Sequence, residues 1–391
     1  MKNDNYIKQD KEVVSFITDR GVEYEEETYY QVEDEKEERA YSDIRKDIYL
    51  SKEQYAINYI NDLIVTGYID LSPEFQRNEV WNDETKKSLF IESLFLNIPI
   101  PIFYAYDNGD SQLMIIDGKQ RLSTIRDFLK NKFQLKNMKY LRKYNGCYFD
   151  DLPDRIKIDF NRYQCHFYVL NHNTPKRYLF DIFMRINTGG EPLKAQEIRN
   201  IFAKPKVREL LKKLSKCQPF LIATRKRITD DRMDAQELVL RYIALLRNYD
   251  FQNGLLKFKE TTLSQLLENT IAALNQMDDF TEITRNFENA CNRSYELFGE
   301  KAFSRLEKKS GKISRKSTMI NRSLFTAVTV ILSNSKYEYV DFKQYTNTIL
   351  DELYYLLKNN GNLLTSATTS KTNTVRLFGY IESLMRDNIK C

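Results

Sequence analysis

The most informative stretch of this chain reads Met114-Ile115-Ile116-Asp117-Gly118-Lys119-Gln120-Arg121-Leu122-Ser123-Thr124-Ile125. Residues 113–116 are apolar throughout, which predicts a buried strand, and Asp117-Gly118 predicts a turn. Apolar residues then recur at helical spacing, so we expect a helix from about Gln120 to Lys130. A turn of this kind directs backbone N–H groups and the positive end of the helix dipole to one point, where Lys119 and Arg121 also lie. An anion, most simply a phosphate, is the expected ligand.

The role of Asp117 stays open on this pattern alone. Its carboxylate could hold a metal ion, a sugar hydroxyl or Arg121 itself. A purely structural alternative is also compatible with the sequence, in which Asp117 caps the helix and Arg121 forms a surface ion pair.

Composition places the chain among soluble globular proteins. Its 391 residues are enough for two domains, or for one large domain with an appendage, and a hydrophobic content of 42% can fill a sizeable core. No run of about 18 apolar residues occurs, and the first residues lack the apolar stretch of a signal peptide, so no membrane association is expected. The five cysteines are scattered without CxxC spacing, which favours reduced thiols in a cytoplasmic protein.

Charge is distributed unevenly along the chain. Residues 1–43 contain 14 acidic and 6 basic residues, a net charge of −8, which leaves +13 on the remainder of a chain whose net charge is +5. The acidic segment is expected to be a solvated, flexible arm; the alternative is that it covers a basic groove and mimics nucleic acid. The basic remainder makes DNA an expected partner.

Periodicity divides the chain into three parts. Residues 1–45 are the acidic arm, residues 46–200 an α/β core, and residues 201–391 a helical domain packed on that core, because no low-complexity linker separates the two. Within the core we predict the following elements: a helix from Ser51 to Thr66, a strand at 68–71, a helix capped by Asn82 and ending near Leu96, strands at 103–106 and 113–116 joined by a hairpin turn at 107–110, a strand at 165–170 and a helical piece at 180–186. Residues from about Lys194 onward show mainly helical periodicity.

Other polar clusters are candidate binding residues. Gln76 and Arg77 lie in a predicted loop before Trp81. Arg185 and Asn187 end a helical piece, and the glycines that follow would let a ligand approach the backbone, although a plain helix C-cap fits equally well.

Two basic runs occur in the C-terminal half. Arg225, Lys226 and Arg227 could contact DNA phosphates or simply form a charged loop before a helix. Residues 312–317 are expected to form a solvated turn.

Several enzyme classes are excluded by the absence of their motifs. Of the two histidines, His166 lies near the start of the predicted strand at 165–170 and His172 just after its end. None lies in the C-terminal half, so a His-Asn-His nuclease site is absent there. No GxxxxGK[ST] loop and no Gly-x-Ser-x-Gly elbow occur.

Taken in order, several motifs resemble the N-terminal domain family of the GmrSD restriction endonucleases, which is related to the ParB/sulfiredoxin-like fold. The resemblance covers roughly residues 46–245 and rests on these segments: Phe75-Gln76-Arg77 with Trp81, Ile98-Pro99-Ile100-Pro101, Ile116 to Thr124, Phe183 to Gly190 with Glu197-Ile198-Arg199-Asn200, and Asp234 with Glu237 to Arg241. It implies an α+β fold with a ParB/sulfiredoxin-like mixed α/β core and a large all-helical C-terminal half.

The resemblance also implies a nucleotide-binding, often nucleotide-hydrolysing, domain used in bacterial defence against phage DNA. Its signature is Asp-Gly-Gln-Gln-Arg, which Asp117, Gly118, Gln120 and Arg121 match. Lys119 departs from the usual Gln; it keeps hydrogen-bond donors for phosphate, but hydrolysis that depends on that amide is in doubt. By the same resemblance, Gln76, Arg77, Arg185 and Asn187 line the same pocket.

The expected function is therefore that of an anti-phage protein that binds, and hydrolyses, a nucleoside triphosphate with Mg²⁺ to control DNA recognition or cleavage. Lys119 and Arg121 would hold phosphates, Arg77 and Arg185 would neutralise developing charge, Asp117 would position the metal or a ribose hydroxyl, and Gln76 or Gln120 would orient water. Two alternatives remain: a metal-dependent DNA nuclease that uses Asp117, and a non-enzymatic DNA-binding specificity subunit that recruits a separate nuclease. The identity of the nucleotide and the oligomeric state, a homo-oligomer included, stay open.

Overall fold

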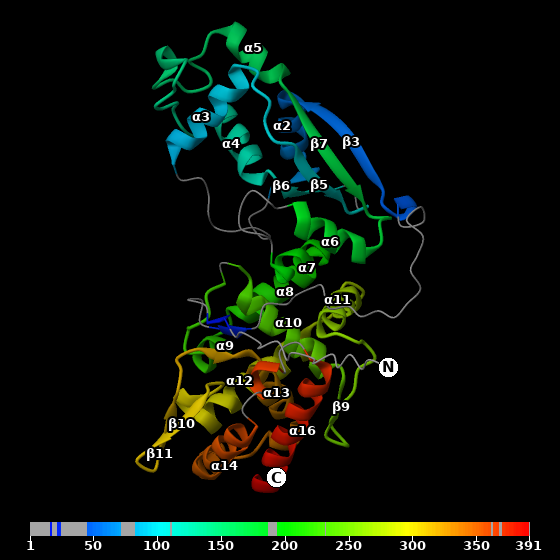
Figure 1. The fold of residues 1–391 in the computed structure, drawn as a ribbon, viewed down its shortest axis with the longest axis vertical. Coiled ribbons are helices and arrows are strands. Elements are labelled where there is room, and N and C mark those ends of the chain that lie inside the picture. The colour runs from blue at the N-terminus through cyan, green and yellow to red at the C-terminus, as the bar shows by residue number, and fades with distance from the viewer. Residues whose placement is uncertain are drawn as a thin grey trace, which may run out of the picture. The chain divides into compact units, whose positions relative to one another are not determined.

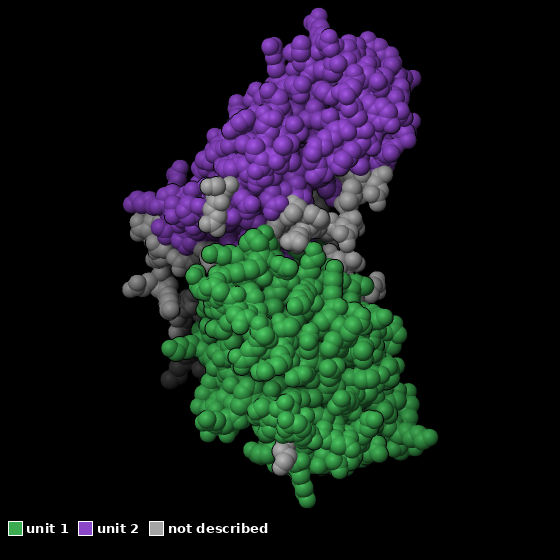
Figure 2. Space-filling model, turned by 180° about the vertical axis from the view of Figure 1, so that it is seen from behind, with its two compact units in different colours: residues 1–33, 203–391 green, residues 34–202 purple. Residues whose placement is uncertain are grey.

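The computed structural model describes residues 16–17, 22–24, 45–71, 83–109, 112–186, 194–230, 232–360, 363–366 and 370–390 (Figure 1). The chain divides into two compact units (Figure 2). Residues 34–202 form one unit, called here the sheet unit. Residues 203–391, together with residues 1–33, form the other, called here the helical unit.

The sheet unit is built on a mixed five-stranded sheet with the strand order β3-β7-β5-β6-β4. The strands β3 and β7 are antiparallel, as are β5 and β6, whereas β7 pairs with β5, and β6 with β4, in parallel. The strands are β3 (Leu50–Ala56), β4 (Ile69–Asp70), β5 (Phe103–Asp107), β6 (Leu113–Asp117) and β7 (Gln164–Asn171).

Helices cover one face of this sheet and bury its core. Alternate residues of the central strands, such as Phe103, Ile115 and Phe167, point into a cluster with apolar residues of α2, α3, α4 and α5. Figure 1 shows these four helices gathered beside the sheet. The helices of the unit are α2 (Ile57–Val65), α3 (Glu84–Phe95), α4 (Lys119–Leu129), η2 (Arg142–Tyr144), α5 (Asp154–Arg162), α6 (Lys176–Ile186) and α7 (Ala195–Phe202).

The helix predicted from Ser51 to Thr66 is wrong in its first half. Residues 50–56 form strand β3, which pairs with β7 along its whole length, and the helix begins only at Ile57. Lys52, Glu53, Gln54 and Ala56 favour a helix locally, but the pairing partner lies more than 100 residues away and is invisible to a local pattern.

Other predicted elements of the sheet unit are confirmed. The strands at 103–106, 113–116 and 165–170 exist, and β5 and β6 form the expected hairpin, where Gly109 has a φ of +79°. The helix that follows the loop is capped by Asp83, whose side chain accepts from the Thr85 N–H, so the cap lies one residue later than predicted; Asn82 itself is outside the described residues. Helix α5 lies between the predicted helix at 120–130 and the predicted strand at 165–170, in a segment for which no element is predicted.

The helical unit is mainly helical, as predicted, and with the mixed sheet it confirms the α+β class. Its helices are α8 (Pro205–Ser215), α9 (Gln218–Ala223), α10 (Asp234–Leu246), α11 (Leu263–Leu274), α12 (Thr281–Phe298), η3 (Gly299–Lys301), α13 (Arg322–Leu332), η4 (Ser335–Tyr337), η5 (Phe342–Tyr345), α14 (Thr346–Asn359), α15 (Leu363–Ser366) and α16 (Lys371–Asn388). Helix α13 is buried along its entire length.

The helical unit is not purely helical, which corrects the sequence-based expectation. It contains the strands β8 (Tyr249–Asp250), β9 (Leu255–Leu256), β10 (Leu306–Lys309), β11 (Lys312–Arg315) and β12 (Ile320–Asn321). The predicted basic turn at 312–317 is largely strand β11, which pairs with β10 around Ser310-Gly311, a two-residue turn with positive φ at both positions.

Two short strands fall in the segment that the sequence predicts to be an arm. These are β1 (Phe16–Ile17) and β2 (Val22–Tyr24), and β2 pairs in parallel with β12. These five residues therefore belong to a small sheet of the helical unit.

Candidate functional site

The junction between β6 and α4 contains the predicted strand, turn and helix. Strand β6 ends at Asp117, helix α4 begins at Lys119, and Gly118 is the N-cap residue between them. Gly118 has a φ of +96°, in the left-handed region that glycine adopts without steric cost. Gly118 has no side chain to cap α4, so the first turn of the helix begins directly at the motif.

Gly118 is required for space as well as for its backbone conformation. A Cβ atom on this residue would overlap the Phe103 ring and approach Arg121 Nη2 to 3.0 Å. Phe103 cannot easily move aside, because its ring stacks on Phe167 in the buried core, with ring centroids 4.9 Å apart. The close approach of strand β5 thus explains why a glycine stands here.

Arg121 joins three segments of the chain. Its guanidinium lies over the Phe103 ring, with Cζ 4.6 Å from the centroid. Nη2 donates to Asp117 Oδ2 at 2.9 Å and to the Ile102 carbonyl at 3.3 Å, and Nη1 donates to the Pro101 carbonyl. The side chain is only 12% exposed, and this burial lowers the pKa of Arg121, while Asp117 acts in the opposite direction. Arg121 therefore holds the start of α4 against the end of β6 and the segment before β5.

Of the three roles that the sequence left open for Asp117, the geometry shows the ion pair with Arg121. The Asp117 side chain is 37% exposed, so solvent and a ligand can still reach it. Among the residues that the structure describes, no group of three or more His, Cys, Asp or Glu side chains is placed to hold a metal ion. Asp117 as a metal ligand stays a prediction that rests on one carboxylate.

A row of polar and aromatic residues leads across the sheet to Asp117. Lys52 on β3 pairs with Tyr168 on β7, Tyr168 with Tyr104 on β5, and Tyr104 with Asp117 on β6. The rings of Tyr104 and Tyr168 meet edge to face at 5.6 Å, and Lys52 Nζ lies 5.5 Å from the Tyr168 centroid. Phe103 and Phe167, the chain neighbours of these tyrosines, point into the core cluster, so the Tyr104 and Tyr168 rings lie on the face of the sheet opposite Phe103 and the Arg121 guanidinium that stacks on it.

The sequence does not predict this row, because its local pattern places Lys52 in a helix and the two tyrosines only within their own strands. Alternation along residues 164–168, in which Gln164, His166 and Tyr168 occupy one face, was the signal that could have found it.

The remaining candidates of the motif are placed as follows. Lys119 and Gln120 occupy the first turn of α4 and are half-buried. Arg185 lies in the last turn of α6 and is exposed. Gln76, Arg77 and Asn187 lie outside the described residues. Arg225, Lys226 and Arg227 follow α9 in the helical unit, not in the unit that carries Asp117.

Comparison with known families adds independent evidence for this domain. Residues 57–203 match the family model of the GmrSD restriction endonuclease, N-terminal domain. The resemblance predicted from the motifs is confirmed over these residues, which include the β6–α4 junction. No curated protein matches the chain in a sequence search.

Over residues 57–203 the chain is therefore similar to a domain of restriction-type defence proteins, a class of proteins that act on DNA. The match covers most of the sheet unit and stops where the helical unit begins. Within the part of the chain that the structure describes, no helix has both the length and the apolar content needed to cross a bilayer.

Proposed function

We propose that this is an anti-phage defence protein whose GmrSD N-terminal domain binds a nucleoside triphosphate at the β6–α4 junction, and that binding and hydrolysis control DNA recognition or cleavage. The observation that carries the proposal is Gly118, a buried glycine with positive φ that brings the start of α4 next to the exposed carboxylate of Asp117. A helix start presented in this way is suited to a phosphate group.

The described residues divide into contact and positioning roles. Lys119 and the first turn of α4 would hold phosphate, and Gln120 would orient water. Arg121 is engaged with Asp117 and two backbone carbonyls, so we assign it a positioning role and not direct contact with phosphate.

The other residues of the proposed pocket enter through the family motif. Gln76, Arg77, Arg185 and Asn187 would supply further contacts to the phosphates. A Mg²⁺ ion that accompanies the nucleotide would be held mainly by phosphate oxygens, with Asp117 as the protein carboxylate in reach of it.

The test is nucleotide binding and phosphate release with ATP, GTP, CTP and UTP in the presence of Mg²⁺. The wild-type protein is compared with Lys119→Ala and with Lys130→Ala, which removes the same charge from the exposed far end of α4. We expect Lys119→Ala to weaken binding of the preferred nucleotide by about tenfold, as for the loss of one charge-assisted hydrogen bond, and Lys130→Ala to bind like wild type.

The outcome also separates the alternatives. Binding without phosphate release would make the protein a ligand-gated DNA-binding subunit, with Lys119 as the departure that removes hydrolysis. An absence of binding to all four nucleotides would overturn the proposal. In that case Mg²⁺-dependent nicking of plasmid that is lost in Asp117→Ala would identify a nuclease.

A further inference from the structure

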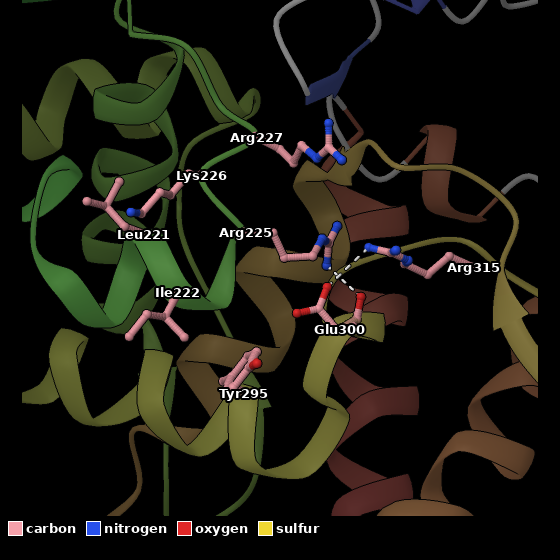
Figure 3. A pocket seen from close by; sticks show the side chains of 8 residues that line it. All are labelled: Leu221, Ile222, Arg225, Lys226, Arg227, Tyr295, Glu300 and Arg315. Carbon is pink, nitrogen blue, oxygen red and sulfur yellow. Dashed lines mark hydrogen bonds and ion pairs between the residues drawn. The ribbon is translucent and has the colours of Figure 1, made fainter.

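A basic pocket lies entirely within the helical unit. It has a volume of about 510 Å³ and is lined by Leu221, Ile222, Arg225, Lys226, Arg227, Tyr295, Glu300 and Arg315 (Figure 3). These residues come from the end of α9 and the turn after it, the last turn of α12, η3 and strand β11. Four of them are cationic and one is acidic, so the lining carries an excess of positive charge.

The backbone at one wall is strained in a specific way. Lys226 N–H donates to the Leu221 carbonyl at 2.8 Å and Arg225 N–H to the Ile222 carbonyl at 2.9 Å, which is the Schellman pattern of a helix C-terminus. Arg225 stands at the left-handed position of this motif, with a φ of +58°, where glycine is usual, and Lys226 follows with +52°. Two non-glycine residues in this region cost about 1–2 kcal/mol each. Local structure therefore does not explain why an arginine and a lysine, and not glycines, occupy these two positions.

Arg225 forms the fixed floor of the pocket. Its guanidinium donates to the carbonyls of Glu300 at 3.0 Å and Ala302 at 2.8 Å, to Ser304 Oγ at 3.0 Å and to the Thr318 carbonyl at 3.4 Å. All four acceptors are neutral, so these bonds orient the arginine without cancelling its charge.

The surroundings confirm that positive charge accumulates here. Burial, together with the neighbouring Arg315 and Arg227, lowers the pKa of Arg225 to about 10. Glu300 opposes this, but its carboxylate is 65% exposed and lies 3.6 Å from Arg315 Nη1, a long surface contact that contributes little. Figure 3 shows Arg225 and Arg315 both directed toward Glu300.

Apolar and aromatic side chains complete the lining of the pocket. Leu221, Ile222 and Tyr295 line it, and Ile222 is 46% exposed. Arginines provide charge-assisted hydrogen bonds to phosphate oxygens, whereas an aromatic ring and aliphatic side chains suit the face of a base. The two kinds of wall together match the two ends of a nucleotide.

We propose that this pocket is a nucleotide phosphate site, separate from the β6–α4 junction, with Lys226, Arg227 and Arg315 as the contacting cations and Arg225 as their fixed support. Its ligand is a phosphate that carries a base, either in a free nucleotide or in a nucleic-acid strand. The proposal goes beyond the function assigned to the sheet unit and does not depend on it. The sequence placed residues 225–227 among DNA contacts; the fold adds Arg315 and Tyr295, which lie about 70 to 90 residues further along the chain.

The test is binding of labelled single-stranded and duplex oligonucleotides, and of ATP, to the full chain. The double variant Arg227→Ala/Arg315→Ala removes two pocket cations and leaves Arg225 in place, so folding is retained. Its matched control, Lys259→Ala/Lys343→Ala, removes the same charge from exposed positions of the same unit outside the pocket. We expect the pocket variant to lose about tenfold in affinity per arginine, and the slope of log affinity against log salt to fall by about two, while the control stays close to wild type.

Comparison of the ATP and oligonucleotide affinities identifies which kind of molecule carries the phosphate. Loss of ATP binding in the pocket variant, measured in a Lys119→Ala background, would identify a free nucleotide; loss of oligonucleotide binding alone would identify a strand. Tyr295→Ala should weaken both ligands but not the competition by inorganic phosphate. Equal affinities of the pocket variant and its control for every ligand would overturn the proposal.

Discussion

At the scale of single residues, the candidate site of the sheet unit depends on one glycine and one arginine. Gly118 allows β5 to approach β6, and Arg121 then closes over Phe103 and fixes Asp117. Neither residue needs to touch a ligand for the site to depend on it. Their effects can therefore be separated from those of Lys119 by measuring stability and binding together.

We expect Gly118→Ala to destabilise the protein by about 2–4 kcal/mol, which combines backbone strain with the overlap on Phe103. Gly146→Ala is the matched control. Gly146 has a similar φ of +86° but open space where a Cβ would lie, so only the strain of about 1 kcal/mol should appear. Denaturant unfolding measures both, and equal losses would show that contact with Phe103 plays no part.

Arg121→Lys should lower stability by about 1–3 kcal/mol even though the charge is kept. A lysine cannot stack on Phe103 and donate to Asp117 and two carbonyls at once. Lys119→Ala should show the opposite pattern, with near wild-type stability and weakened nucleotide binding. Chemical unfolding and nucleotide titration of both variants test this, and an Arg121→Lys protein of unchanged stability would rule out the positioning role.

At the scale of elements, helix α3 organises the loop that follows α4. Glu92 on α3 is 3% exposed, and its carboxylate accepts backbone N–H bonds from Lys139 at 3.0 Å, Tyr140 at 2.7 Å and Leu141 at 2.8 Å. Burial alone would raise the pKa of Glu92, but these three bonds outweigh it and lower the pKa. The ionised carboxylate is thus the form that the fold selects.

Because the folded-state pKa of Glu92 is lowered, its contribution is complete above the unfolded-state value of about 4.3 and is lost as the pH falls through the folded-state value. We expect Glu92→Gln to cost about 1–3 kcal/mol at pH 7, with the difference from wild type shrinking below about pH 4. Glu84→Gln on the same helix, whose exposed side chain pairs with Lys136, should cost less than about 1 kcal/mol. A pH-independent loss in Glu92→Gln would contradict the assignment.

Sequence reasoning succeeded where the signal was local. The β6–Gly118–α4 junction, the β5–β6 hairpin and the helical character of the second half follow from apolar periodicity and glycine positions. Strand β3 is not predicted because its pairing partner β7 lies more than 100 residues away, and the presence of Arg225 and Arg315 in one pocket is not predicted because they lie 90 residues apart. The sequence indicates that Asp117 is an unusual charge in this turn, but only the structure shows that its carboxylate forms an ion pair with Arg121.

At the scale of the whole molecule, opposite charges are separated along the chain. Residues 1–43 carry a net charge of −8 and the remainder +13. Replacing Glu25, Glu26, Glu27, Glu33 and Glu35 with Gln leaves the described strands β1 and β2 unchanged in sequence. We expect this variant to bind duplex DNA more tightly at low salt, because less negative charge competes for the basic surface.

The gain in affinity should fade as ionic strength rises toward 1 M, where screening acts within about 3 Å. Fluorescence anisotropy with a labelled duplex across a salt series measures it. Unchanged affinity at low salt would mean that the acidic segment does not compete with DNA for the basic remainder of the chain.

The left-handed turn at Arg225 and Lys226 also bears on the order in which the helical unit folds. Its backbone is unfavourable by itself, and the acceptors that hold Arg225 lie 75 to 93 residues further along the chain. We therefore expect the Arg225 side chain to reach its final position only after η3, Ser304 and the segment before β12 have assembled around it. On this view the basic pocket forms late in folding, and a chain in which the pocket is present has already folded the segments around it.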